Sequence, residues 1–294
     1  MFPWKETDLD QDAFQLSEPA QLLSCAVFAS PHSGNHYPEA FLAQSQLDRQ
    51  AIRSSEDAFV DQLFACAPEF GAPLLAAAVP RAFVDLNRST DELDPALIEG
   101  VRRQGHNPRV ASGLGVVPRV VANGRAIYRG KIRLAEAQAR ISTYWHPYHA
   151  ALQALLEQAH RRFGQAVLID CHSMPHEATD SAGRAGRQAP EIVIGDRFGA
   201  AAGADVVDRI EAAFAAAGLK VVRNAPFAGA YVTQAYGRPS RNQHAVQIEI
   251  DRALYMDERL IRPNENFEAL RRLLRQVIAD IALIGPEEMP LAAE

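Results

Sequence analysis

Short apolar runs bounded by turn residues alternate along this chain with longer segments in which apolar residues recur at helical spacing. The short runs predict strands, because a brief apolar run between turn signals suits a buried strand. The predicted strands cover residues 25–29, 73–79, 83–86, 166–170, 192–195, 219–222 and 245–250. Strands that alternate with helices are typical of an α/β protein. We therefore predict a mixed central sheet flanked by helices.

The segments with helical spacing predict helices. One begins at Ser54, which suits the capping position, and continues through an acidic first turn to Phe64. A longer helix covers about residues 134–162, and Pro147 should kink it because proline has no backbone N–H. Two further helices are predicted over residues 197–216 and 266–283.

Residues 89–130 form a different kind of segment, rich in Gly, Pro and Arg and without a sustained period. Long irregular segments within compact domains are commonly binding loops or lids. We find no internal repeat and no linker, so we predict one catalytic domain over residues 1–294 with a long insertion at about 89–130. Residues 177–188 are predicted to form a loop directly after a strand end, where it could close over a ligand.

The chain has 294 residues, of which 48% are hydrophobic and 22% are charged, enough to bury a substantial core. It contains no apolar stretch of the roughly 18 to 20 residues that a membrane span needs, and its first residues are too acidic for a signal peptide. Cys25, Cys66 and Cys171 lack the spacing of a disulfide framework or of a cysteine zinc site. We therefore expect a cytoplasmic protein with no membrane partner.

The net charge of -6 argues against nucleic acid as a partner, because phosphate binding requires a concentrated basic surface. Arginine far outnumbers lysine in this chain. The planar guanidinium group matches both oxygens of a carboxylate, whereas an ammonium group offers only a point charge. This preference matters if some arginines bind carboxylates, although most are expected to be solvated surface residues.

Two histidines occupy the same position relative to predicted strands. His32 lies in the sequence SPHSGNHYP just after the run 25–29, and His172 follows the run 166–170 in IDCHSMP. In an open α/β sheet, ligands bind at the carboxyl ends of the strands, so the two imidazoles can converge there. A single histidine is more often a hydrogen-bonded structural residue, but the repeated placement favours a functional pair.

A catalytic zinc site usually has three protein ligands, so two histidines require a further ligand such as a carboxylate. Glu56 and Asp57 lie in the first turn of the helix after the His32 loop, where a side chain can point back to the strand ends. Either acid could instead complement the helix dipole. Asp61, one turn further along, is a weaker candidate.

Glu249 lies within a predicted strand, between the apolar residues Ile248 and Ile250. A carboxylate is costly to bury without a partner. A structural arginine could neutralise it, or it could act as a general base beside a metal-activated water. The sequence is equally compatible with both alternatives.

Arg81 and Arg88 bracket the sequence RAFVDLNR, in which Asn87 precedes Arg88. An arginine beside an asparagine suits the capture of a carboxylate, because the guanidinium group and the amide both donate hydrogen bonds. The alternative is a turn stabilised by Asp85 and Asn87, with Arg88 in solvent.

These segments and several others together resemble the N-formylglutamate amidohydrolase family. The resemblance rests on PHSG, the helix start at 57–63, RAFVDLNR, YWHPYHAAL, IDCHSMP, NAPFAGAYVTQAYGRP and HAVQIEIDRALYMDE, which together span roughly residues 27–257. That family is similar to the zinc carboxypeptidases and aspartoacylases in fold and metal chemistry. The resemblance therefore implies a zinc-carboxypeptidase-like (phosphorylase/hydrolase-like) architecture for the predicted α/β sheet.

By this resemblance, His32, Asp57 and His172 are the metal ligands and Glu249 is the catalytic acid/base. The implied metal is Zn2+, although nitrogen and oxygen ligands also suit another divalent transition metal. Carboxypeptidases commonly take their carboxylate ligand from an HxxE motif, but this chain has asparagine at the third position after His32. The carboxylate must therefore come from elsewhere, and Glu56 remains an alternative to Asp57.

The Asn87–Arg88 pair matches the Asn-Arg pair with which those relatives bind a substrate carboxylate. Further carboxylate contacts are expected from Arg81, Arg140 or Arg238. The segment STDELDPALIEG, which follows Arg88, differs from the corresponding sequence of the deformylase itself. The identity of the substrate is therefore left open at this point.

The resemblance implies a metal-dependent amidohydrolase whose partner is a small-molecule N-acyl amino acid. The expected substrate is N-formyl-L-glutamate, and the products are formate and L-glutamate, a reaction of histidine degradation. One alternative is an aspartoacylase-like or carboxypeptidase-like hydrolase of another N-acyl amino acid. A second alternative is a protein that binds N-acyl amino acids without turnover. The sequence does not define the oligomeric state.

Overall fold

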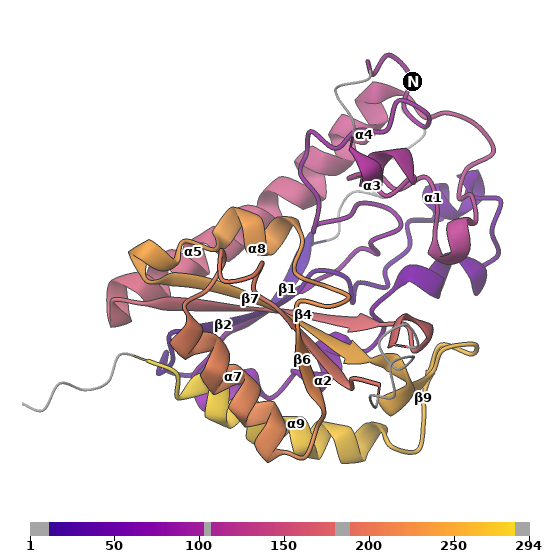
Figure 1. Ribbon diagram of the computed structural model, residues 1–294. Coiled ribbons are helices and arrows are strands. Elements are labelled where there is room, and N and C mark those ends of the chain that lie inside the picture. Colours follow the sequence, from indigo (N-terminus) through magenta and orange to yellow (C-terminus); the bar gives the residue numbers. More distant parts are fainter. Residues whose placement is uncertain (1–11, 103–106, 180–188, 286–294) are drawn as a thin grey trace, which may run out of the picture.

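A central sheet with helices on both faces organises the chain (Figure 1). The computed structural model describes residues 12–102, 107–179 and 189–285. The sheet consists of β1 (Phe14–Ser17), β2 (Ala26–Ser30), β3 (Leu74–Ala77), β4 (Ala166–Met174), β5 (Ile192–Gly195), β6 (Val221–Arg223) and β7 (Gln243–Asp251). Its spatial order is β1-β3-β2-β4-β7-β5-β6.

The strand directions make this a mixed sheet. Strands β3, β2, β4 and β7 run parallel to one another and form its centre. Strand β1 pairs antiparallel with β3, and β5 pairs antiparallel with β7. The carboxyl ends of β2, β4 and β7 therefore meet along one edge, and the predicted mixed α/β architecture is confirmed.

Each face of the sheet carries its own hydrophobic core. Along β2, the side chains of Val27 and Ala29 pack with α5 (His146–Phe163) on one face, whereas Phe28 packs toward the opposite core. That second core includes the apolar sides of α7 (Ala204–Ala216) and α9 (Phe267–Ala282). Successive residues of a strand point to opposite faces, so a continuous apolar run such as that of β2 marks a strand buried on both sides.

Most predicted strands are present with shifted ends, but one is absent. Residues 83–86 form turns rather than a strand, and the backbone N–H groups of Phe83 and Val84 both donate to the Pro80 carbonyl oxygen. The apolar side chains of this segment are nevertheless buried in the core, so an apolar run here reflects packing and not extension. Strand β4 continues to Met174, which places His172 inside the strand and not after it.

The helix predicted from Ser54 to Phe64 does not form as one unit. The structure has a 3-10 helix, η2 (Ala51–Ser55), and a short helix, α2 (Val60–Leu63), separated by a break. Phe59 adopts a left-handed φ of 68° within that break. Glu56 and Asp57 therefore lie in an irregular connection, and the expectation that they form an acidic first helical turn was wrong.

The long helix predicted over about residues 134–162 is irregular near Pro147, as expected. Helix α4 (Leu134–Arg140) passes through a π-helical turn, η5 (Ile141–Trp145), into α5. Pro147 lies in the first turn of α5, where it supplies no N–H to the preceding turn. A π-helical turn accommodates such a defect by adding a residue to the local turn.

Other elements differ from prediction mainly in where they begin. Helix α7 starts at Ala204 and not at Arg197, because Arg197 and Phe198 both have a left-handed φ of 56°. The remaining short elements are α1 (Glu39–Gln44), η3 (Ala67–Phe70), α8 (Tyr231–Tyr236), η6 (Pro239–Arg241), η7 (Arg252–Leu254), β8 (Met256–Asp257) and β9 (Arg262–Pro263). None of the helices that the structure describes is both long and apolar enough to cross a membrane.

The segment 89–130 adds a largely irregular layer beside the carboxyl edge of the sheet. Within its described residues the helical elements are α3 (Pro108–Ala111) and η4 (Ala122–Gly124). In Figure 1, α1 and α3 lie together at the upper right, beyond the strands. Most of the loop predicted over 177–188, namely 180–188, lies outside the described residues.

Candidate metal centre and active site

Three side chains predicted as metal ligands converge at the carboxyl edge of the sheet. The Oδ2 atom of Asp57 lies 2.9 Å from Nδ1 of His172 and 3.4 Å from Nδ1 of His32. One potential ligand atom from each residue lies within 4.8 Å of the others. All three residues are at most 2% exposed. We call this group the His-Asp-His cluster.

Each member of the cluster comes from a different element. His32 follows β2 in a tight turn, and a Cβ atom on Gly34 would lie only 2.1 Å from the Val79 carbonyl oxygen, so this close approach requires glycine. Asp57 lies in the break between η2 and α2, and its N–H donates to the His32 carbonyl oxygen at 3.1 Å. His172 belongs to β4. The break in the predicted helix is therefore what brings the carboxylate to the histidines.

The structure also distinguishes the two neighbouring acids. Glu56 accepts hydrogen bonds from the Tyr37 hydroxyl and from Nε and Nη2 of Arg53, which occupy both of its oxygens. The backbone at Glu56 is extended, with ψ at 144°, so adjacent side chains point in opposite directions. Asp57, and not Glu56, faces the two histidines.

Both histidines have an acid beside the nitrogen that faces away from the cluster. Nε2 of His32 contacts Oδ1 of Asp85 at 2.8 Å, and Nε2 of His172 lies 3.0 Å from Oδ1 of Asp170. A carboxylate partner of this kind fixes the tautomer and the ring orientation of a metal-binding histidine, as Asp85 does for His32. At His172 the hydrogen-bond partner of Nε2 is Nδ2 of Asn87 at 3.2 Å, and the contact with Asp170 does not have hydrogen-bond geometry. In both rings Nδ1 is the nitrogen that faces Asp57.

The donor set fits a divalent metal ion. Among the described residues, Nδ1 of His32 is buried without a hydrogen-bond partner, which is costly unless another group binds it. Two imidazole nitrogens and one carboxylate oxygen are the ligands of many catalytic zinc sites. Burial alone would raise the pKa of Asp57, but its interactions with His172 and His32 hold that pKa well below the ordinary value. Asp57 is therefore an anion, as a metal ligand must be.

Glu249 lies directly beside the cluster on β7, where it pairs in register with His172 of β4. Gln247 donates a hydrogen bond from Nε2 to Oε1 of Glu249 at 2.8 Å, and its own Oε1 accepts from the Ala230 N–H at 3.1 Å. Burial raises the pKa of Glu249 to about 7, and the charge of Asp57 reinforces the shift against that of His172. A carboxyl group with a pKa near neutrality suits proton transfer.

A cavity of about 590 Å³ opens beside the cluster and contains most of the predicted substrate residues. Arg81, Asn87 and Arg88 all line it. Arg88 donates to the carbonyl oxygens of Leu114 at 2.9 Å and of Asn87 at 2.7 Å, and no carboxylate of the described residues forms an ion pair with it. Its guanidinium charge is thus available to a ligand in the cavity.

Two of the arginines named from sequence do not reach this cavity. Arg140 is buried elsewhere, where it pairs with Glu136 and contacts the Tyr128 hydroxyl. Arg238 donates to the carbonyl oxygens of Gln234 and Gly237 near the surface. Neither residue lines the cavity, so neither is included in the substrate site proposed below.

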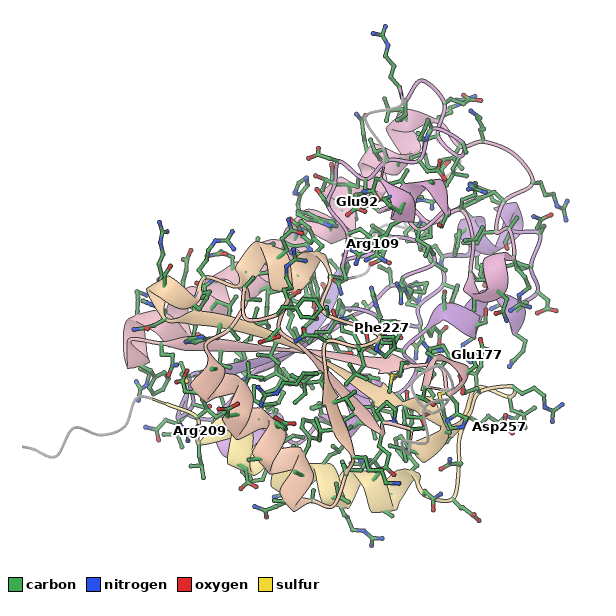
Figure 2. The ribbon with its side chains drawn as sticks, in the orientation of Figure 1. Glu92, Arg109, Glu177, Arg209, Phe227 and Asp257 are labelled. Carbon is green, nitrogen blue, oxygen red and sulfur yellow. The ribbon has the colours of Figure 1, made fainter. Side chains whose placement is uncertain are left out.

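Sequence reasoning missed several polar residues of the site, among them Arg109, Asp170, Gln247 and Arg252. Gln247 had a detectable signal, because it lies two residues before Glu249 and therefore on the same face of the strand. Arg109 comes from α3 in the irregular layer, and Figure 2 shows it across from Phe227. The position of Arg109 depends on how the irregular layer packs against the sheet, which the sequence around Arg109 does not show.

Comparisons with known proteins point to one family. The sequence pattern of the N-formylglutamate amidohydrolase family matches residues 24–256. An N-formylglutamate deformylase of Pseudomonas aeruginosa is 31% identical over 268 residues, which cover 89% of this chain and 94% of that relative. The crystal structure of an N-formylglutamate amidohydrolase from Ralstonia eutropha is 36% identical with a TM-score of 0.85, covering 92% of this chain and 96% of the other. A protein of Agrobacterium tumefaciens, 17% identical with a TM-score of 0.65, shares the fold.

Proposed function

The chain belongs to the N-formylglutamate amidohydrolase family, and we propose that it hydrolyses N-formyl-L-glutamate to formate and L-glutamate. The observation that carries this proposal is the convergence of His32, Asp57 and His172 beside Glu249 and a cavity lined by arginines. Hydrolysis of an amide requires an activated water, a polarised carbonyl group and a proton for the departing amine. The residues around the cavity can meet each of these requirements.

His32, Asp57 and His172 would hold a divalent metal ion, with zinc as the preferred candidate. Such an ion supplies Lewis acidity toward the formyl oxygen and lowers the pKa of water to about 7. The neighbouring acid Asp85 keeps the His32 imidazole in the orientation that this role requires, and the Asn87 amide contacts Nε2 of His172. Cobalt, nickel or manganese would be compatible with the same donors.

Glu249 acts as the proton carrier in this proposal. Because Oε1 accepts the hydrogen bond from Gln247, the second oxygen, Oε2, is the one that takes a proton from the attacking water. The same atom then delivers the proton to the substrate nitrogen, since an amine is too basic to leave unprotonated. Gln247 fixes the carboxyl group in one orientation throughout.

Arg88 binds a substrate carboxylate, and Arg81 lies in the same cavity at the side of the cluster. Arg81 pairs with Asp85 at 2.9 Å, so it is held in place by the acid that also orients His32. Burial lowers the pKa of Arg88, and the like charges of Arg81 and Arg109 lower it further against the opposing charge of Asp85. An anionic substrate would relieve this crowding of positive charge, even though the whole chain carries a net charge of -6.

The direct test measures release of L-glutamate from N-formyl-L-glutamate and from its N-acetyl and N-succinyl analogues, together with release of formate from the first. Release of formate that is abolished by a chelator and restored by zinc is the expected result. Preferential cleavage of an acetyl or succinyl substrate would favour an aspartoacylase-like enzyme instead. Binding without turnover of any of the three would identify a non-catalytic N-acyl amino acid binding protein.

We also propose a single catalytic domain, a place in histidine degradation and a cytoplasmic location. One sheet from Phe14 to Asp251 unites the described residues, which supports the first. Cys25, Cys66 and Cys171 are all free thiols, as is usual in a reducing compartment. Cell fractionation and growth on histidine as a nitrogen source test the last two.

A further inference from the structure

Arg252 is a buried arginine that contacts the candidate metal ligand directly. It is the first residue of η7, immediately after β7, and is 6% exposed. Its Nη2 donates a hydrogen bond to Oδ1 of Asp57 at 2.9 Å. Its Nε donates to the Ser173 hydroxyl at 3.2 Å, and Nη2 also reaches the Ser173 carbonyl oxygen at 3.4 Å. The guanidinium group therefore joins the ends of β4 and β7 to the irregular connection that carries Asp57.

The two oxygens of Asp57 consequently have different partners. Oδ2 faces Nδ1 of His172 and Nδ1 of His32, whereas Oδ1 faces away from them toward Arg252. Arginine–carboxylate hydrogen bonds between buried groups are short and strong, because both partners are charged and water is excluded. One oxygen is thus already engaged before any metal binds.

We propose that Arg252 is a positioning residue that holds Asp57 as a monodentate metal ligand. This inference rests on the proposed function, since it presupposes that the His-Asp-His cluster binds a metal. With Oδ1 retained by Arg252, the metal would receive three donor atoms from the protein, as in catalytic zinc sites that leave a position for water or substrate. With Oδ1 released, the carboxylate would be free to bind through both oxygens.

The surroundings of Arg252 explain why Oδ1 stays engaged. If Asp57 turned both oxygens to the metal, the guanidinium charge would lose its closest acidic partner while remaining buried. Glu258 lies 4.0 Å from Nη1, which is beyond hydrogen-bond distance, and therefore does not replace Asp57. The Ser173 contacts are to neutral oxygens and cannot neutralise the charge. Monodentate binding is therefore the arrangement that keeps the buried charges of Arg252 and Asp57 paired.

The test is the visible spectrum of the cobalt-substituted protein, compared between the unmodified chain, Arg252→Met and Arg252→Lys. Cobalt with fewer ligands absorbs more strongly in the visible range than cobalt with five or six. We expect Arg252→Met to lose cobalt absorbance severalfold while retaining the ion in competition with a chelator. Arg252→Lys, which keeps a cationic donor, should restore most of the absorbance.

Arg53→Met is the matched control, because Arg53 pairs with Glu56, the neighbouring acid that faces away from the cluster. Its cobalt spectrum should equal that of the unmodified chain. An unchanged spectrum in Arg252→Met would overturn the inference. So would a loss of cobalt affinity of about 10-fold or more with an unchanged spectrum, because that result indicates a support for the fold and not control of coordination.

X-ray absorption of the zinc-loaded, unmodified protein keeps the inference testable if Arg252→Met does not fold. A bidentate carboxylate in that measurement would overturn the inference even if the protein releases formate from N-formyl-L-glutamate. A chain that releases formate without binding metal at the cluster would overturn it as well. A chain that binds no metal and releases no formate would remove the proposed function together with it.

Discussion

Arg88 and Arg140 are both buried arginines in the same half of the chain, yet their surroundings differ. Arg140 is 2% exposed and pairs with Glu136, and its guanidinium carbon lies 4.3 Å from the centre of the Phe83 ring. Arg88 is 7% exposed and lines the cavity beside the His-Asp-His cluster. The described residues give it carbonyl oxygens as acceptors and no ion-paired carboxylate.

The two arginines differ in whether the guanidinium charge is neutralised within the protein or left available to a ligand. A guanidinium group that is neutralised and packed against aromatic rings adds to the stability of the fold. One that is held by neutral acceptors keeps its charge for a ligand. Changes at the carboxyl edge of the sheet should therefore reduce activity with little effect on folding. Changes around Arg140 should reduce the stability of the fold with little effect on activity.

The largest expected effect is the loss of activity in His32→Ala. Removal of one ligand should empty the metal site, and activity should fall by about 10⁴-fold or more, because metal assistance supplies several kcal/mol of barrier reduction. The measurement is kcat/KM together with zinc content after dialysis. His36→Ala is the control, since His36 lies in the same loop but does not line the cavity. Activity that survives in His32→Ala would contradict the proposed metal site.

Glu249→Gln should lower kcat by about 10²–10⁴-fold, the usual contribution of a general acid–base group. In the unmodified enzyme the base must be deprotonated. Burial raises the pKa of Glu249 to about 7 before the charge of a metal ion is counted, and a bound cation would lower that pKa. The rate should therefore decline by about tenfold per unit as the pH falls below a pKa that lies at or below about 7, and level off above it. The profile of kcat/KM against pH checks this, and the acidic limb should disappear in Glu249→Gln. A limb that persists would assign the ionisation to another group.

Arg140→Met tests the structural role of the second arginine and should reduce stability without reducing activity. Because it leaves Glu136 buried without its partner, it should lower the free energy of unfolding by about 3–5 kcal/mol. Urea denaturation measures this loss, and kcat/KM per folded molecule should stay nearly unchanged. Arg238→Met is the control and should change stability by less than about 0.5 kcal/mol, since Arg238 contacts carbonyl oxygens near the surface. Loss of substrate affinity in Arg140→Met would contradict the purely structural role assigned to Arg140.

Arg88→Met should have the smallest effect of the four. Loss of hydrogen bonds to a charged substrate group costs about 1.5–3 kcal/mol each, so kcat/KM should fall by roughly 10- to 100-fold, mainly through KM. The urea midpoint should change little. Arg88→Lys should recover only part of the affinity, because an ammonium group cannot reproduce the guanidinium fork. A large loss of stability in Arg88→Met would show that Arg88 resembles Arg140 after all.

Much of this site was predictable because its signals are local. Apolar runs marked β2, β4 and β7, and the histidines and Glu249 sit at or near the ends of those runs. The apolar run 83–86 misled the strand prediction, since packing of a turn into the core produces the same composition as a buried strand. The helix expected from Ser54 failed for a related reason, because favourable capping residues do not reveal a break imposed by the site.

The sequence by itself determined that this is an α/β protein with two histidines that follow predicted strands, because strand period and strand-end chemistry are properties of adjacent residues. That the two strands are neighbours came only from the sheet order. Only the tertiary structure showed that Asp57 faces the two histidines and Glu56 does not, because adjacent side chains of an extended segment point in opposite directions. It also decided which arginines meet the cavity. The bond between Arg252 and Asp57 joins residues 195 positions apart. Such a contact depends on how whole strands and loops pack, and no local pattern in the chain encodes it.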